Sequence, residues 1–223
     1  MTGLSLFWEY RVILWHGLLI NLLVFLLSSA LGLIVGLFAC IARLSDLGLL
    51  RKTAAFYIEV IRSAPELVLL FWVYSVVPVL LSELLGTRLT LDPIVAATLA
   101  LGLVSSGYFA ETFRAGIEAV PAGHVEAAHA LGMSTPDIYR RIVLPQAIRL
   151  MLPELTSQNI GLLKTTTLVS VITVPDIMYQ INLIVQQEMQ PLPLYTGTAI
   201  AFFVLIFALT SLVGRGGNRL RAA

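Results

Sequence analysis

Apolar residues dominate long stretches of the chain. Runs without any charged side chain extend over residues 12–42, 93–110 and 189–214. A helix that crosses a bilayer needs about 20 mainly apolar residues, and each of these runs approaches or exceeds that length. Two more segments are apolar but contain a few ionisable residues. The pattern therefore predicts five membrane-spanning helices, at about 14–42, 54–82, 92–118, 147–173 and 194–214.

The apolar runs are continuous, whereas a strand of a membrane barrel alternates between apolar and polar residues over about ten positions. A helix also pairs its backbone amides within one segment, as the hydrocarbon region requires. We therefore predict an all-α integral membrane protein in which residues 1–223 form a single domain. For the two segments that contain ionisable residues, the alternative is a core helix of a soluble domain.

Composition supports the membrane interpretation. Hydrophobic residues make up 58% of the chain and charged residues 12%, with a mean hydropathy of +0.90. A soluble domain carries about 25% charged residues. The net charge of +1 gives no basic excess for binding nucleic acid, and the single cysteine, Cys40, excludes an internal disulfide and a zinc site of four cysteines. The expected surroundings are a lipid bilayer.

Basic residues predict the orientation, because segments that remain in the cytoplasm are enriched in Lys and Arg. Five spans place the loops on alternating sides of the membrane. One side receives Arg43, Arg51, Lys52, Arg114, Arg140, Arg141, Arg149, Arg215, Arg219 and Arg221. The other side receives Arg11 and Arg88. We therefore expect the N-terminus outside and the C-terminus in the cytoplasm.

Segment 119–146 is the longest one outside the predicted spans, and it faces the cytoplasm in this orientation. A short helix is expected over about 124–131, with Gly132 as its C-terminal stop. A second short helix is expected to begin with Thr135 as its N-cap and to end at Pro145. The loop would thus contain two short helices with a sharp turn between them.

This loop is unusually apolar for a segment in contact with water, because two short helices cannot shield all of its aliphatic side chains. Two interpretations remain open from the residues alone. The side chains pack on the cytoplasmic ends of the spans, or one face of the loop fills a groove on a cytoplasmic partner.

Several motifs resemble those of one known group of proteins. The loop is similar to the EAA loop of the membrane subunits of bacterial ATP-binding-cassette importers, with the pattern Glu126-Ala127-Ala128, Gly132 and Ile142-x-Leu144-Pro145. Stretches 62–65, 106–117 and 163–168 resemble elements of the polar amino acid permease family within that group. The resemblance covers nearly the whole chain and implies the transmembrane fold of a type I importer.

In that family, the helix before the glycine is a coupling helix that sits in a cleft of a separate ATPase subunit. The residues implied in this contact are Glu126, Ala127, Ala128, Leu131, Gly132 and Met133. The glutamate would anchor the contact, the two alanines would allow close packing, and the glycine would set the turn.

The resemblance also implies partners: an ATPase dimer, a second permease subunit that is identical or paralogous, and an extracytoplasmic binding protein, all at the bacterial inner membrane. The chain itself lacks a phosphate-binding loop, because Gly161-Leu162-Leu163-Lys164-Thr165 has the wrong spacing. We therefore expect that it is not an enzyme, that it holds no cofactor, and that the partner ATPase binds ATP. No metal site is expected, since the histidines lack metal-ligand spacing.

Polar side chains inside the spans are candidates for a substrate path, because a charge at mid-bilayer costs about 2.5–3.5 kcal/mol on insertion. The candidates are Glu66, Ser157, Gln158, Lys164 and Thr165. Gln158 occupies a position where the resembling permeases often have Glu, and its neutral amide disfavours a purely cationic substrate. For Lys164, three roles remain open. Its ammonium group extends to the membrane–water interface, pairs with Glu154 or Glu66, or lines the substrate path.

Other polar residues in the spans have structural explanations. The spacing permits ion pairs within one helix between Glu59 and Arg62 and between Glu111 and Arg114. His16 and Asn21 in the first span are expected to make hydrogen bonds between helices.

The resulting hypothesis is a permease subunit of an ATP-driven importer of polar amino acids. A related alternative is the import of another small zwitterion, such as an ectoine-like or opine-like solute. A transporter driven by an ion gradient, or a channel, is an alternative from a different class, although neither explains an apolar cytoplasmic loop.

Overall fold

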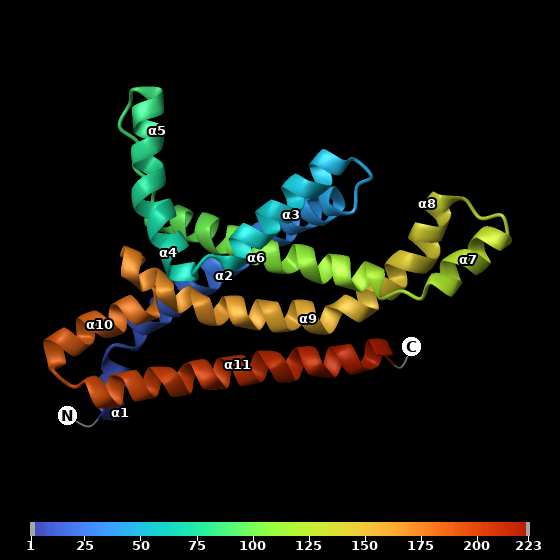
Figure 1. Ribbon diagram of the computed structural model, residues 1–223. Helices are drawn as coiled ribbons and strands as arrows, with labels where there is room; N and C mark the ends of the chain where they lie inside the picture. Colours follow the sequence, from blue (N-terminus) through green and yellow to red (C-terminus); the bar gives the residue numbers. More distant parts are fainter. Residues whose placement is uncertain (1–2, 222–223) are drawn as a thin grey trace.

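The computed structural model describes the backbone of residues 3–221 and the side chains of residues 6–208, 210 and 211. As predicted, every regular element in this part of the chain is a helix (Figure 1). The elements are α1 Gly3–Glu9, α2 Arg11–Arg43, α3 Gly48–Ser63, α4 Glu66–Phe71, η1 Trp72–Val76, α5 Val77–Leu85, α6 Pro93–Glu118, α7 Ala122–Ala130, α8 Thr135–Ile138, η2 Tyr139–Val143, α9 Leu144–Thr165, η3 Thr166–Ile172, α10 Ile177–Glu188 and α11 Pro191–Arg221. Arg215, Arg219 and Arg221, which contribute to the predicted orientation, have side chains outside the described ones.

Four helical segments in the described residues are long and apolar enough to cross a membrane: α2, Glu66–Leu85, α6 and Pro191–Ala208. A fifth candidate is the pair formed by Thr135–Ile172 and α10, which is bent by 51°. In Figure 1, α1 and α10 lie at one end of the long helices, and α7 and α8 lie at the opposite end. α11 begins beside α1 and runs from there toward the end at which α7 and α8 lie.

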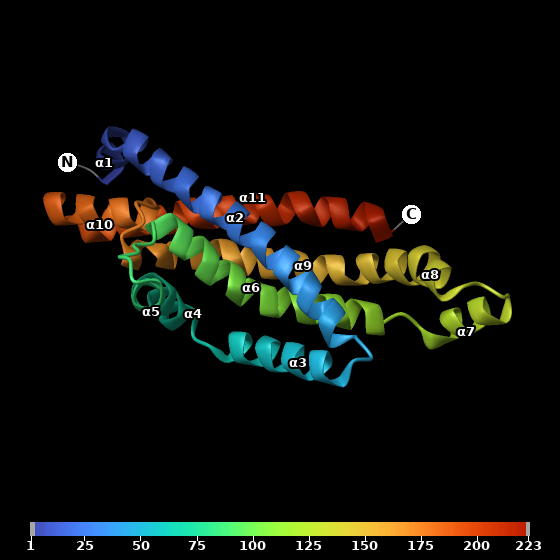
Figure 2. The same ribbon diagram turned by 90° about the horizontal axis from the view of Figure 1, so that it is seen from above.

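α2 and α6 form the central contact, and they cross each other in Figure 2. Glycines allow the two backbones to come close. A Cβ atom on Gly36 would lie 2.8 Å from the carbonyl oxygen of Ser106, and one on Gly32 would lie 3.0 Å from the Cβ atom of Ser105. These distances are shorter than van der Waals contact, so larger residues at either glycine would push the helices apart.

The second predicted span, 54–82, is not one continuous helix. α3 ends at Ser63, and the backbone of Ala64 and Pro65 is extended before α4 begins at Glu66. A proline lacks an N–H donor and disfavours helical geometry in the residue before it, which explains the break. α3 lies beside α2 and α6, whereas α5 projects away from the other helices (Figure 1).

Two other prolines, Pro78 and Pro145, lie in helical segments that continue past them. Each follows a π-helical turn, η1 or η2, in which the residue before the proline donates its backbone N–H to the carbonyl oxygen five residues back. The wider turn accommodates the proline ring. The prediction that Pro145 ends a short helix is therefore wrong, because α8, η2 and α9 follow one another without a break.

The fourth predicted span, 147–173, corresponds to most of α9 and to η3. After η3 the chain turns through Thr173, whose φ angle is +66°, and α10 leaves in a new direction. A β-branched residue rarely adopts this left-handed conformation, so its surroundings have to hold the turn.

A buried polar cluster, formed by Asn21, Thr166 and Asp176, holds this turn. Nδ2 of Asn21 donates to Oδ2 of Asp176 at 3.0 Å and to the carbonyl oxygen of Thr166 at 3.2 Å. Oδ1 of Asn21 accepts from the backbone N–H of Ile177 at 3.0 Å. All three side chains of the cluster are fully buried. The hydrogen bond predicted for Asn21 is therefore present, and it joins the first span to the end of the fourth. The one predicted for His16 is wrong, because its side chain is exposed and makes no hydrogen bond among the described residues.

Candidate functional site

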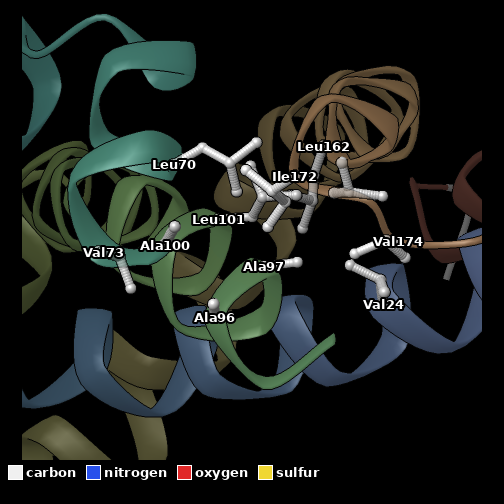
Figure 3. Packing of buried hydrophobic residues seen from close by; sticks show 11 residues of the cluster. Val24, Leu70, Val73, Ala96, Ala97, Ala100, Leu101, Leu162, Ile172 and Val174 are labelled. Atoms are coloured by element: carbon white, nitrogen blue, oxygen red, sulfur yellow. The ribbon is translucent and has the colours of Figure 1, made fainter. Parts of the chain in front are cut away.

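A cavity of about 110 Å³ lies between α4, α6 and α9. Its lining consists of Glu66, Leu101, Val104, Ser105, Tyr108, Phe109, Gln158, Gly161, Leu162 and Thr165. Figure 3 shows that Leu70 of α4, Leu101 of α6 and Leu162 of α9 meet in one apolar cluster. Since Leu101 and Leu162 also line the cavity, the cavity borders the hydrophobic core where these three helices meet.

Polar groups from all three helices line the cavity. Glu66 is the first residue of α4, so the break before it places its carboxylate at a helix N-terminus, where a negative charge is favourable. α6 contributes Ser105 and Tyr108, and α9 contributes Gln158 and Thr165. Among these described lining residues, Glu66 is the one with a carboxyl group.

The polar lining keeps capacity for further hydrogen bonds. Nε2 of Gln158 donates to Oε1 of Glu154 at 2.8 Å, and Oγ of Ser105 donates to the carbonyl oxygen of Leu101 at 2.8 Å. The amide oxygen of Gln158 and the lone pairs of the hydroxyl groups can each accept another hydrogen bond. The cavity therefore offers one carboxylate and several neutral groups to a small polar ligand.

Tyr108 is positioned by the end of α3. The guanidinium group of Arg62 lies 5.4 Å from the centroid of the Tyr108 ring, and the Tyr108 hydroxyl donates to the carbonyl oxygen of Arg62 at 3.4 Å. The adjacent Gly107 allows this approach, since a Cβ atom there would lie 3.0 Å from Cγ of Arg62. The contact fixes a wall of the cavity against the residues that precede the helix break.

The structure brings three of the five predicted path residues together, namely Glu66, Gln158 and Thr165. Ser157 and Lys164 do not line the cavity, and both side chains are exposed. The reason is helical phase. The lining positions on α9 recur every three or four residues and share one face, whereas Ser157 and Lys164 point about 100° away from that face. In the described part of the chain, Lys164 forms no ion pair.

The two predicted ion pairs have different outcomes. Arg114 pairs with Glu111, through Nε at 2.9 Å, and also with Glu118 one turn further along α6. Arg62 does not pair with Glu59 among the described residues, because its guanidinium group lies over Tyr108 instead.

At the other end of α6, the predicted turn at Gly132 is present. The backbone N–H of Gly132 donates to the carbonyl oxygen of His129 at 2.9 Å, and that of Met133 donates to the carbonyl oxygen of Ala128 at 3.1 Å. These two hydrogen bonds form a Schellman motif. The φ angle of Gly132 is +75°, which is unfavourable for residues with a side chain. The glycine therefore sets the direction in which the chain leaves α7.

The residues implied in the coupling contact divide into two groups. Glu126, Ala127 and Leu131 are exposed, and Leu131 has 83% of its surface accessible. Ala128 is only 2% exposed, and it packs with the half-buried Met133 against an apolar cluster. This cluster includes Ile138, Val143, Ala147 and Met151. The close packing implied for Ala128 is thus made within the chain, and Met133 faces the same interior.

The N-cap of the helix that follows also differs from the prediction. Ser134, not Thr135, is the N-cap of α8, and its hydroxyl oxygen accepts from the backbone N–H of Asp137. Thr135 is already the first helical residue, because Pro136 fits the first turn after it.

Residues 28–221 match the family model described as "Binding-protein-dependent transport system inner membrane component". The chain belongs to this family. The predicted family is thereby confirmed, and we refer to the protein below as the permease.

Relatives and a solved structure extend this assignment. The permease is 35% identical over 189 residues to "Probable amino-acid ABC transporter permease protein YckA" of Bacillus subtilis, which covers 85% of this chain and 80% of the relative. It is 33% identical over 208 residues to the octopine transport system permease protein OccM of Rhizobium radiobacter, covering 92% and 84%. The structure entitled "Crystal structure of an amino acid ABC transporter with histidines" superposes with a TM-score of 0.89, at 32% identity, over 98% of this chain and 99% of the other.

These likenesses confirm the predicted fold class. The permease is all-helical in its described residues and has the fold of a type I ABC importer permease.

The sequence interpretation missed two polar lining residues, Ser105 and Tyr108, together with Gly161 and the apolar part of the lining. Ser105 and Tyr108 lie three positions apart in α6, so they share one helix face. Gly161 carries no chemical signal of its own, and only its helical phase relative to Gln158 and Thr165 places it in the lining.

Proposed function

We propose that the permease is the membrane-spanning subunit of an ATP-driven importer of polar amino acids. The observation that carries this proposal is the arrangement of two features on one set of helices. A small cavity with five polar side chains in its lining lies between the helices, and a sharply turned, exposed loop lies beyond the end of α6. The proteins named amino acid transporters or permeases that share its sequence and fold support the same substrate class.

The chemistry of the cavity suits a small zwitterion or neutral polar solute. The Glu66 carboxylate can accept hydrogen bonds from an ammonium group. The amide of Gln158 and the hydroxyl groups of Ser105, Tyr108 and Thr165 can bind further polar groups without adding charge. The single carboxylate therefore matches a substrate with one ammonium group better than one with two cationic groups.

For the loop, we propose contact with a separate ATPase subunit. Glu126, Ala127 and Leu131 form its exposed part, while Ala128 and Met133 anchor the loop to the permease. Leu131 is 83% exposed at the turn of the loop, so its apolar side chain is available for contact with the ATPase. Movement of the ATPases would then reach the membrane helices through this loop. ATP would be bound by the ATPase, since the chain lacks a phosphate-binding loop.

The proposed assembly contains two permease subunits, two ATPases and an extracytoplasmic binding protein in the bacterial inner membrane. The distribution of basic residues supports an N-terminus outside and a C-terminus in the cytoplasm. The positions of α1 and the end of α11 at opposite ends of the helices are compatible with this orientation (Figure 1).

The proposal is tested by uptake into proteoliposomes that contain the permease with its binding protein, with and without the ATPase. Radiolabelled glutamine, glutamate, histidine and arginine are offered singly. We expect uptake only when the ATPase and internal ATP are both present. Uptake driven by an ion gradient without the ATPase would contradict the proposal.

A second candidate substrate is an opine, because a relative of similar length is named an octopine permease. Unlabelled octopine is therefore added as a competitor in the same assay. Stronger inhibition by octopine than by any amino acid would favour this second candidate.

A further inference from the structure

α7 carries the proposed ATPase contact, so its attachment to the rest of the permease determines how movement is transmitted. Part of this attachment is apolar, through Ala128 and the half-buried Val125. In the part of the chain that the structure describes, one side-chain hydrogen bond joins α7 to another helix. Nδ1 of His124 lies 2.9 Å from Oε1 of Gln146 in α9.

The second hydrogen bond of the Gln146 amide, made by Nε2, shows which atom is the donor in the bond to His124. Nε2 of Gln146 donates to the carbonyl oxygen of Ile142 at 2.9 Å, and a carbonyl oxygen can only accept. The amide oxygen therefore faces His124, and Nδ1 of His124 is the donor. Both the imidazolium and the neutral tautomer with its hydrogen on Nδ1 can donate in this way.

Gln146 lies in the first turn of the helix that lines the cavity. Gln158 follows about 18 Å further along α9, at 1.5 Å per residue. Between them α9 is packed tightly on α6, since a Cβ atom on Gly116 would lie 2.9 Å from Cβ of Met151. Gln146 and the lining residue Gln158 therefore belong to one helix, which packs closely on α6 between them.

We propose that His124 is a positioning residue that links the coupling helix to α9 through Gln146. The apolar contacts of α7 are non-directional and hold it on the cluster that it covers. The hydrogen bond is directional and adds a fixed contact between α7 and α9. Movement of α7 therefore displaces α9, and with it the cavity lining. This proposal rests on the proposed function of the permease.

His129 provides a matched control on the same helix. It is exposed like His124, and it makes no side-chain hydrogen bond to another helix in the described residues. Its replacement changes the composition and charge of α7 to the same extent as replacement of His124. A difference between the two variants therefore reports on the link to Gln146.

The experiment compares His124→Ala, Gln146→Ala, the double variant, Gln146→Glu and His129→Ala in proteoliposomes with the ATPase and binding protein. ATP hydrolysis and uptake of a mixture of radiolabelled L-amino acids are measured in the same vesicles. The readout is the amount of substrate imported per ATP hydrolysed. Assembly of permease and ATPase is measured separately by co-purification.

We expect both single alanine variants to assemble normally and to import about fivefold less substrate per ATP, the factor that corresponds to one hydrogen bond of about 1 kcal/mol. The double variant should be no worse than either single variant, because both remove the same interaction. Gln146→Glu keeps an acceptor for His124 and should retain coupling. His129→Ala should match the wild type.

Three results would overturn this proposal: unchanged coupling in His124→Ala, an equal loss in His129→Ala, or failure of His124→Ala to bind the ATPase. The last would place His124 in the docking surface. If the wild-type complex itself shows no ATP-dependent uptake, the proposed function fails. If the wild-type complex shows ATP-dependent uptake and His124→Ala is equally well coupled, only the proposed link between His124 and Gln146 is contradicted.

Discussion

Thr165 and Thr166 are neighbours in the chain but belong to two different polar regions. Thr165 lines the cavity together with Glu66. Thr166 is fully buried in the polar cluster, where its carbonyl oxygen accepts from Asn21. The end of α9 thus separates a solvent-accessible polar site from one that is closed to solvent.

The two regions differ in how their hydrogen bonds are satisfied. In the polar cluster, Asn21 uses both ends of its amide for partners within the chain, and Asp176 caps α10 through Tyr179. In the cavity, Glu66 and Gln158 are only half-buried, and they keep capacity for an added partner. A polar residue in a membrane span therefore stabilises the fold when its partners are internal, and it is a candidate for ligand binding when they are not.

The largest expected effect is on stability, from Asn21→Leu. This change leaves the carboxylate of Asp176 and the backbone N–H of Ile177 buried without their partner. We expect the free energy of unfolding to fall by about 3 kcal/mol. Thermal unfolding in detergent, followed by loss of the monodisperse peak, measures the change. An unaltered unfolding temperature would show that the polar cluster is not structural.

Glu66→Gln tests whether the cavity binds the substrate. The change removes the charge of the lining but keeps its shape, so stability should stay close to that of the wild type. If Glu66 binds the ammonium group of the substrate, uptake at low substrate concentration should fall about thirtyfold, as expected for one charge-assisted hydrogen bond. Radiolabelled uptake and thermal unfolding on the same preparation separate the two effects. Equal uptake by variant and wild type would remove Glu66 from the path.

Gln158→Glu sharpens the prediction about substrate charge. A second carboxylate in the lining should favour cations, because it adds a negative charge beside the ligand. We expect arginine to compete about tenfold better relative to glutamine than it does with the wild type. Competition assays at fixed ionic strength measure this ratio. An unchanged profile would place Gln158 off the path.

The smallest effects are expected from valine at Thr165 or Thr166. We expect the first change to alter substrate affinity and the second to alter stability. Thr166→Val removes the hydroxyl that lies 3.3 Å from Nδ2 of Asn21 and should lower the unfolding free energy by about 1 kcal/mol. Thr165→Val should leave stability unchanged and reduce apparent substrate affinity about twofold. If both variants alter only stability, or both alter only substrate affinity, the distinction between the cavity and the buried polar cluster is contradicted.

Most of the helices could be predicted because their signals are local. The uncharged run 12–42 exceeds the length of a span and becomes α2, and Asp92 caps α6 through a side chain that accepts from Ile94. The same local reasoning holds at Pro65, which breaks its helix as the chemistry of proline favours. It failed at Pro145, because a π turn before Pro145 accommodates the ring.

The candidate site could be predicted in part. Intramembrane polarity selected Glu66, Gln158 and Thr165 as candidates, and the structure places these three residues around one cavity. It also included Lys164, which is exposed on another face of α9. Tyr108 was missed, because its role in the lining depends on the end of α3 lying over α6.

By itself, the sequence determined the all-helical membrane fold, the family and the turn at Gly132, because hydropathy, motif spacing and backbone geometry are properties of neighbouring residues. The tertiary structure decided which face of α9 borders a cavity, that Ala128 is buried while Leu131 is exposed, and that His124 reaches Gln146. These outcomes depend on how separate helices pack against one another. Packing brings together side chains that are far apart in the sequence, and a pattern of neighbouring residues does not predict which ones will meet.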